Sequence, residues 1–137
     1  MSQSVSASAL RVGVEQFVVT ASSNHAIVVD ADRERNSAPS PMELVLMGLC
    51  ACTASDIDIV LRKKREPFMY LEVRAEAERA KDPPRVYTSI KLVFTVGGKV
   101  TKKAVEDAVR LSEEKYCSVS AMLQKTAKIT TQIVYVP

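Results

Sequence analysis

The 137-residue chain has the length of one domain, and we expect residues 1–137 to form a single domain. Its composition, 47% apolar and 26% charged, is typical of a globular protein. A net charge of +3, without an RNP-type or recognition-helix motif, argues against a nucleic-acid partner. No signal peptide is visible, and the most apolar stretch, residues 41–54, is too short to span a bilayer. We therefore expect a soluble cytoplasmic protein that does not enter a membrane.

The first third of the chain predicts two strands, a loop and a helix. Residues 4–31 are β-rich, with a turn at residues 22–25, and the polar residues 30–40 predict a mobile surface loop. A helix is predicted from about Pro41 to about Lys64, with Ser40 as its cap and Glu43 near the positive end of its dipole. Its first half is apolar all round, which is typical of a helix at the centre of an assembly.

The remaining residues predict a second set of strands and helices. Alternating apolar and polar positions predict strands over residues 69–79 and 86–96. An amphipathic helix is predicted over residues 101–115, a short helix over 119–125 and a closing strand over 129–136. The order is β-β-α-β-β-α-α-β with antiparallel pairs, so the fold class is α+β.

The three cysteines lie in different settings. Cys52 is in the middle of an apolar helix, and burial raises the pKa of a thiol, which favours a structural role. Cys50 is two positions away and points to another side of the helix. Cys117 lies near the start of a helix, where backbone N–H groups and Lys115 can stabilise a thiolate, so it is a candidate reactive thiol. With one histidine in the chain, no zinc site is expected.

Two further polar residues are weaker candidates. His25 lies in a turn beside Asn24, and a solvated histidine is the simpler interpretation. Asp56 lies one turn past Cys52 on the same side of the helix, where a carboxylate would oppose thiolate formation. It is interpreted as an anchor for an arginine or as a polar residue of a partly exposed turn. On residue types alone, the chain has one plausible reactive cysteine and one buried cysteine.

Two stretches together resemble the OsmC/Ohr family. Residues 38–44 with 49–54 place a cysteine on a helix about ten residues after a proline, and residues 114–120 hold a Cys-x-Val-Ser turn. Residues 78–88 are similar to the YhfA-like branch of that family. The two cysteines, Cys52 and Cys117, are 65 positions apart (117 − 52).

This resemblance implies a fold and a chemistry. The implied OsmC-like fold is an intertwined homodimer, with long central helices wrapped by antiparallel sheets. By motif position, Cys52 would attack a hydroperoxide to give a sulfenic acid, and Cys117 would condense with it to a disulfide. An external dithiol, such as a lipoyl group, would reduce this disulfide, and neither a cofactor nor a metal is expected. The implied function is reduction of organic hydroperoxides in oxidative-stress defence.

The chain departs from the family pattern near the helix start. The family glutamate that orients a thiolate-stabilising arginine is replaced by Met42, and Glu43 follows one position later. Arg11 is the one arginine that precedes the polar loop, so Glu43 and Arg11 are auxiliary candidates. Other candidate arginines are Arg33, Arg35, Arg79 and Arg85.

Two alternatives to an enzyme remain open. One is a non-catalytic dimer that binds a small apolar ligand, for which Met42, Met47 and Met122 would supply adaptable contacts. The other is a redox sensor in which the same disulfide forms and is recognised by a partner protein. Consumption of thiols by peroxide separates the first alternative from the enzyme.

Overall fold

The computed structural model describes residues 3–137, which form two small sheets and several helices. The chain divides into two compact units, with the boundary between Val45 and Leu46. An α+β fold is confirmed.

The first unit contains three strands where the sequence predicted two, so that prediction is wrong. Strand β1 (Ala7–Gly13), β2 (Gln16–Ala21) and β3 (Ala26–Asp30) form one antiparallel sheet in the order β1-β2-β3. The missed hairpin turns at Glu15, which adopts a left-handed backbone conformation with φ 56°. Glutamate is uncommon in this conformation, and neither turn position, Val14 or Glu15, holds the Gly or Asn that usually marks such a turn, although Gly13 precedes them.

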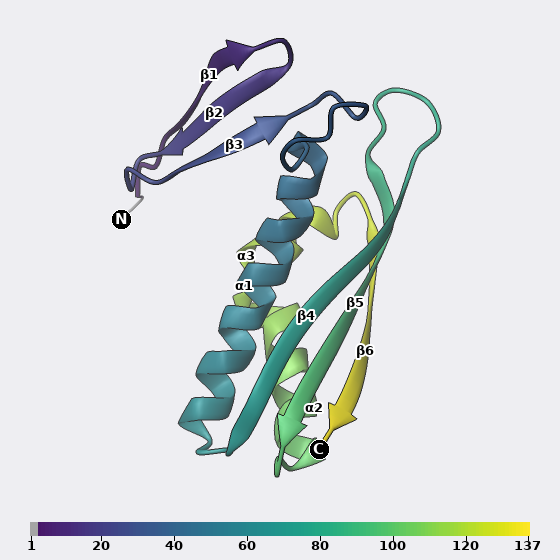
Figure 1. The fold of residues 1–137 in the computed structure, drawn as a ribbon. Coiled ribbons are helices and arrows are strands. Elements are labelled where there is room, and N and C mark those ends of the chain that lie inside the picture. The colour runs from purple at the N-terminus through teal and green to yellow at the C-terminus, as the bar shows by residue number, and fades with distance from the viewer. Residues whose placement is uncertain (1–2) are drawn as a thin grey trace. The chain divides into compact units, whose positions relative to one another are not determined.

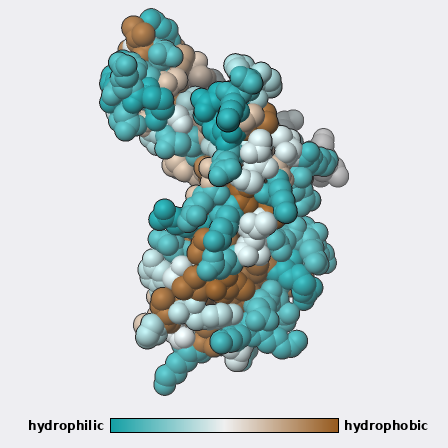
Figure 2. Space-filling model, turned by 90° about the vertical axis from the view of Figure 1, so that its right-hand side faces the viewer, coloured by the Kyte–Doolittle hydropathy of each residue, from teal (hydrophilic) through white to brown (hydrophobic). Residues whose placement is uncertain are grey.

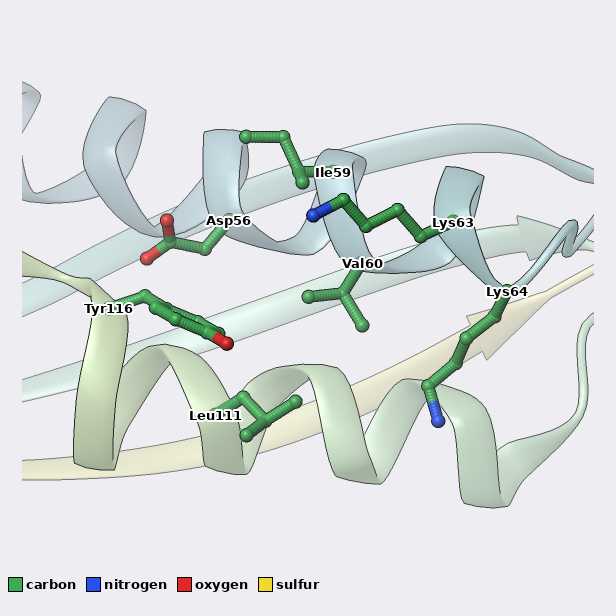
Figure 3. Close-up of a pocket in the computed structure, with 7 residues that line it drawn as sticks. All are labelled: Asp56, Ile59, Val60, Lys63, Lys64, Leu111 and Tyr116. Atoms are coloured by element: carbon green, nitrogen blue, oxygen red, sulfur yellow. The ribbon is translucent and has the colours of Figure 1, made fainter.

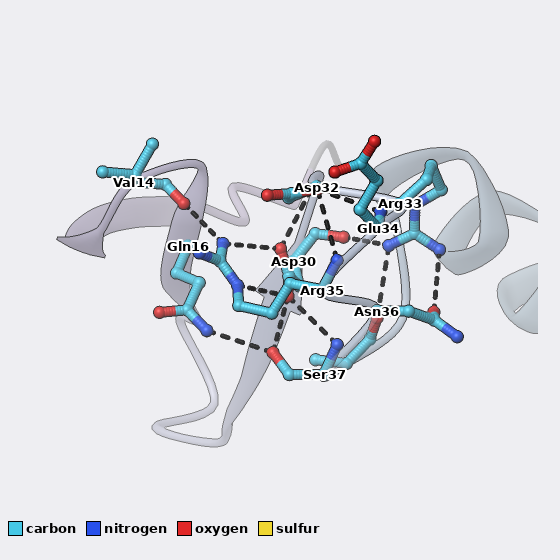
Figure 4. A network of polar contacts seen from close by, with 10 residues as sticks. Val14, Gln16, Asp30, Asp32, Arg33, Glu34, Arg35, Asn36 and Ser37 are labelled. Atoms are coloured by element: carbon cyan, nitrogen blue, oxygen red, sulfur yellow. Dashed lines mark hydrogen bonds and ion pairs between the residues drawn. The ribbon is translucent and has the colours of Figure 1, made fainter.

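The polar loop after β3 is organised by the fully buried carboxylate of Asp30 (Figure 4). Arg35 donates two hydrogen bonds to it, at 2.9 and 2.8 Å, and Ser37 donates from its backbone N–H at 3.0 Å and from its hydroxyl at 2.6 Å. These donors, chiefly Arg35, hold the pKa of Asp30 far below its ordinary value. A loop expected to be mobile is therefore tied at its middle to the end of β3.

Helix α1 (Pro41–Lys63) begins and ends within one residue of its predicted bounds. The Ser40 hydroxyl accepts a hydrogen bond from the Glu43 backbone N–H at 3.1 Å, and the Glu43 carboxylate accepts one from the Ser40 N–H at 2.9 Å. This reciprocal pair is a capping box, which satisfies two N–H groups that the first helical turn leaves without partners. The predicted cap is confirmed.

The sheet of the second unit combines both strand directions. Strand β4 (Phe68–Arg79) and β5 (Tyr87–Gly98) are antiparallel, whereas β6 (Lys128–Val136) runs parallel to β5. The prediction of purely antiparallel pairs is therefore wrong. Helices α2 (Lys102–Leu111) and α3 (Ser118–Leu123) carry the chain back along the sheet before β6, as a parallel connection requires (Figure 1).

The core of the second unit lies between its helices and one face of its sheet. Alternate residues of β5 are almost wholly buried, and in α2 one stripe is buried, as predicted for an amphipathic helix. In α1, buried positions recur with helical spacing at Leu49, Thr53, Ile57, Val60 and Leu61. The largest fully buried side chains of this unit are those of Phe94, Leu49, Ile57, Leu61, Ile90 and Leu92.

Much of α1 remains apolar and uncovered in the single chain. The helix has 23 residues, and 18 consecutive ones have a mean hydropathy of 1.9, so it is long and apolar enough to cross a membrane. Of those 18 residues, 28% are buried. The core helix of a soluble protein can be equally long and apolar, and in α1 Asp56 and Asp58 interrupt the apolar surface. Met47 and Ile59 are exposed, and apolar patches interrupt the hydrophilic surface in Figure 2.

The Asp30 network predicts how the loop responds to a change of charge. We expect Asp30→Asn to release Arg35 and Ser37. Trypsin should then cleave after Arg33 and Arg35 faster than in the wild type, and mass spectrometry of the fragments over time measures the two rates.

The Asp30 carboxylate also contributes to the free energy of unfolding above its ordinary pKa of 3.8, and this contribution is lost as the pH falls below that value.

Glu34→Gln is the matched control, because it removes an acidic charge from an exposed side chain of the same loop. Equal cleavage rates in Asp30→Asn and wild type would show that the buried carboxylate does not organise the loop.

Candidate functional site

The rotation of α1 about its axis decides where its two cysteines point. The side chains of Leu49 and Ile57 are fully buried in the core. Cys50 lies against the sheet, where its thiol interacts with the backbone of Ala75 in β4, and burial raises the pKa of the thiol. Cys52 is two residues further along the helix and points elsewhere, so the predicted separation of the two thiols is confirmed.

The chain segment before Cys117 is not the regular helix that the sequence predicted. The α-helix ends at Leu111, and Ser112–Tyr116 form a π-helical turn in which the N–H of Cys117 donates to the carbonyl of Ser112 at 3.0 Å. Such a turn holds one more residue than an α-helical turn and changes the direction of the side chains that follow. Cys117 ends the turn with 3% of its surface exposed.

Cys117 caps the start of α3, as its predicted place at a helix start requires. Its sulfur accepts a hydrogen bond from the Ser120 N–H at 3.3 Å. The pKa of this thiol is nevertheless raised to about 12, chiefly by burial and to a smaller extent by the nearby Cys52 and Asp56. Lys115 lies over the Tyr116 ring, at 5.4 Å from its centroid. Desolvation outweighs the helix terminus and so counts against a thiolate at Cys117, and the reactivity of this thiol stays a prediction.

The two cysteines that the sequence separates by 65 positions come together in the structure. The sulfurs of Cys52 and Cys117 and a carboxylate oxygen of Asp56 all lie within 4.8 Å of one another. Asp56 lies on the same side of α1 as Cys52, as its spacing predicted. The Ser112 hydroxyl donates to the Asp56 carboxylate at 2.9 Å and so joins the π-helical turn to α1. Two thiols and one fixed carboxylate thus face each other.

An open cavity of about 440 Å³ lies between α1 and the α2 segment, next to this cluster (Figure 3). Asp56 and Tyr116 form part of its wall, and Ile59, Val60 and Leu111 add apolar surface. Lys63 and Lys64 also line it: in Figure 3 the Lys63 side chain extends back along α1 toward Asp56, whereas Lys64 lies at the far end. The cavity therefore offers apolar surface and two positive charges on the same side of the fold as Asp56.

The auxiliary candidates belong to the first unit, where their partners are local. Glu43 forms an ion pair with Arg33 at 3.2 Å in addition to its capping bonds. Arg11 is an exposed residue of β1, and Arg35 is bound to Asp30. Near the helix start, Glu43 is therefore paired with Arg33, which was one of the other candidate arginines.

The other candidate arginines and the histidine have structural surroundings. The Nε of Arg79 donates to the carbonyl of Arg85 at 2.9 Å, and Arg85 donates to that of Ala80 at 3.3 Å. These two arginines therefore hold the connection between β4 and β5. His25 lies in an exposed turn with its Nδ1 at 3.2 Å from the Ser23 hydroxyl, which agrees with a solvated histidine.

Sequence reasoning missed one residue of this cluster, Ser112. Ser112 reaches Asp56 from the π-helical turn. The sequence pattern over residues 101–115 predicted a regular helix and gave no sign of that turn. Asp56 carried a usable signal, because its i,i+4 spacing from Cys52 placed both on one side of α1.

Comparison with known proteins agrees with this arrangement of elements. A family model described as OsmC-like protein matches residues 34–132. The chain belongs to the OsmC family. It is 44% identical over 115 residues to protein YhfA of Escherichia coli K12, an alignment that covers 83% of this chain and 85% of YhfA. The predicted family membership is confirmed.

Solved structures share the OsmC fold over nearly the whole chain. An OsmC-like protein from Mycoplasma pneumoniae matches with a TM-score of 0.86 at 16% identity and covers both chains completely. An organic hydroperoxide resistance protein from Elizabethkingia anophelis matches with a TM-score of 0.74 at 15% identity, over 99% of each chain. At these identities the likeness concerns the fold alone.

The burial of the three thiols predicts an order of alkylation. In the reduced protein at about pH 8, we expect iodoacetamide to modify Cys52 first, because burial raises the pKa of both Cys50 and Cys117. Peptide mapping after short exposure measures each site, and unfolded protein provides the reference in which the three thiols react alike. Preferential labelling of Cys117 would contradict the described burial.

The raised pKa of Cys117 also predicts a dependence of stability on pH. Its ordinary value is 9.0 and its folded value about 12, so the folded state holds the proton more tightly across that interval. The contribution of the protonated Cys117 thiol to the free energy of unfolding is therefore complete below pH 9 and decreases as the pH rises towards 12. We expect the difference in free energy of unfolding between wild type and Cys117→Ala, measured in urea, to change in this direction above pH 9. A difference that does not vary with pH would contradict the assignment.

Proposed function

We propose that this OsmC family protein is a thiol-dependent peroxidase that reduces organic hydroperoxides in oxidative-stress defence. The observation that carries the proposal is the approach of Cys52 and Cys117 to within 4.8 Å from separate elements of the fold. Structural neighbours described as organic hydroperoxide resistance proteins support the same class of chemistry.

The different burial of the two thiols supports different roles. Cys52 is half-buried, whereas Cys117 is 3% exposed. A peroxide can therefore reach Cys52 more easily, and we assign the attack to its sulfur. The sulfur takes the terminal oxygen of the hydroperoxide, the O–O bond breaks, and the products are a sulfenic acid on Cys52 and an alcohol.

Cys117 is placed to complete the reaction as the resolving thiol. Its sulfur attacks the sulfenic acid of Cys52, which forms the disulfide and releases one water molecule. The raised pKa keeps Cys117 protonated until then, so its thiol is held in reserve next to Cys52. An external dithiol, such as a lipoyl group, then reduces the disulfide by thiol–disulfide exchange. This sequence of steps uses no bound cofactor.

The cavity next to Asp56 supports an organic substrate. The apolar side chains of Ile59, Val60 and Leu111, with the ring of Tyr116, can receive the hydrocarbon part of a hydroperoxide. Hydrogen peroxide has no such part and gains nothing from this surface. Asp56 opposes a negative charge on the neighbouring sulfur of Cys117, so the carboxylate is expected to slow the attack of that thiol on the sulfenic acid.

We further propose that the protein acts as a cytoplasmic homodimer without nucleic-acid or membrane partners. The support is the uncovered apolar surface of α1, where Met47 is exposed in the single chain. A second copy of α1 would cover such a surface, as expected for a helix that is apolar all round.

Peroxide titration of cysteine variants tests the proposal. We expect one equivalent of an organic hydroperoxide to remove two thiols from the reduced wild type and to produce a Cys52–Cys117 disulfide, detected by peptide mapping. Cys52→Ser should abolish peroxide consumption, because the attacking sulfur is missing. Cys117→Ser should still consume peroxide but should accumulate the sulfenic acid of Cys52, which a dimedone probe traps.

Cys50→Ser is the matched control, since it removes a thiol from the same helix that faces the sheet instead of the cluster. Its peroxide consumption should equal that of the wild type. If the wild type keeps its thiols in the presence of peroxide, the peroxidase proposal is wrong, and the cavity of about 440 Å³ would then favour a non-catalytic ligand-binding protein.

A further inference from the structure

We propose that the reduced thiol cluster is also a binding site for one Zn²⁺ ion per chain, with Cys52, Asp56 and Cys117 as its protein ligands. The sequence argued against zinc because the chain has one histidine. The structure supplies a different donor set, two sulfurs and a carboxylate oxygen. The inference does not depend on peroxidase activity, because the thiols can bind a metal whether or not they react with peroxide.

The spacing of the three ligand atoms suits a tetrahedral zinc site. None of the three is more than 4.8 Å from another. Bond lengths of about 2.3 Å for Zn–S and about 2.1 Å for Zn–O separate tetrahedral ligand atoms by roughly 3.6–3.8 Å. Shifts of about 1 Å, within the reach of side-chain rotation, would close the cluster around an ion.

The chemistry of the three groups also favours a cation. Two sulfurs and a carboxylate oxygen lie within 4.8 Å of one another, and each group is negatively charged once it is deprotonated. A divalent cation placed between them would attract all three groups, and its binding would release one proton from each thiol that is protonated.

Neighbouring hydrogen bonds already orient two of the ligands. The Ser112 hydroxyl donates to one oxygen of the Asp56 carboxylate at 2.9 Å, and the Ser120 N–H donates to the sulfur of Cys117 at 3.3 Å. Donors of this kind fix the direction of ligand atoms and support the charge of metal-bound carboxylate and thiolate groups. Both contacts therefore fix the direction of a ligand atom that the proposal uses.

The cavity beside Asp56 gives an ion a path and leaves room for a fourth ligand. Asp56 forms part of the wall of this open space of about 440 Å³. Three protein ligands and an accessible fourth position for water are the coordination of exchangeable zinc sites. Two thiolates favour Zn²⁺ over Mg²⁺ or Ca²⁺, which take oxygen ligands.

A zinc ion at this position would mask both thiols. Oxidation of the pair by a hydroperoxide, which yields the disulfide, an alcohol and water, removes both thiolate ligands. Binding and oxidation therefore exclude each other, and the disulfide form should not hold zinc.

Competition with a chromophoric zinc chelator measures binding to the reduced full-length chain. We expect one equivalent of Zn²⁺ to bind, and binding to Cys52→Ser or Cys117→Ser to be weaker by about 100-fold or more, with a loss of at least about 10-fold in Asp56→Asn. Cys50→Ser is the matched control and should bind as tightly as the wild type. Cobalt(II) should give the thiolate charge-transfer and visible bands of a tetrahedral site.

A second measurement uses the wild type alone and does not depend on the folding of variants. Zinc should slow alkylation of Cys52 and Cys117, and chelation should restore it. Failure to bind zinc, or binding that Cys50→Ser loses and Asp56→Asn keeps, would overturn the site. Because these readouts involve no peroxide, a failed metal site and a failed peroxidase are distinguished.

Discussion

The packing of α1 on its sheet is the constraint on which the rest of the second unit depends. The helix buries Leu49, Ile57 and Leu61 completely, and its rotation about its axis is thereby fixed. Cys50 then faces β4, while Cys52 and Asp56 face the segment that carries Cys117. A helix turned by one residue, about 100°, would separate the two cysteines of the cluster.

The thiol cluster combines groups that do not favour one another electrostatically. Cys117 is buried, which raises the pKa of its thiol, and Asp56 adds a negative charge to the same small volume. The Ser112 hydroxyl and the Ser120 N–H compensate in part, each with a hydrogen bond to one member of the cluster. Perturbed titratable groups of this kind gather at functional sites, which makes this cluster a candidate site. Peroxide chemistry and metal binding are the two uses that we propose for these side chains.

Helical spacing and capping signals predicted α1 within one residue, and β-strand alternation predicted β4 and β5 closely. These predictions succeeded because they rest on local periodicity. The hairpin at Glu15, the parallel direction of β6 and the π-helical turn at Ser112 were missed. Each of them depends on backbone conformations or strand pairings that side-chain patterns do not encode.

The sequence by itself determined the family and singled out Cys52 and Cys117 as the pair of interest, because motif residues and their order along the chain are properties of the sequence alone. It also determined that Cys50 and Cys52 diverge, since two residues on a helix are about 200° apart. Only the tertiary structure decided that Cys117 is buried, that Asp56 lies within 4.8 Å of both sulfurs, and that Ser112 holds this carboxylate. These relations join residues that are far apart in the chain, and their distances are set by how α1, the π-helical turn and the sheet pack together.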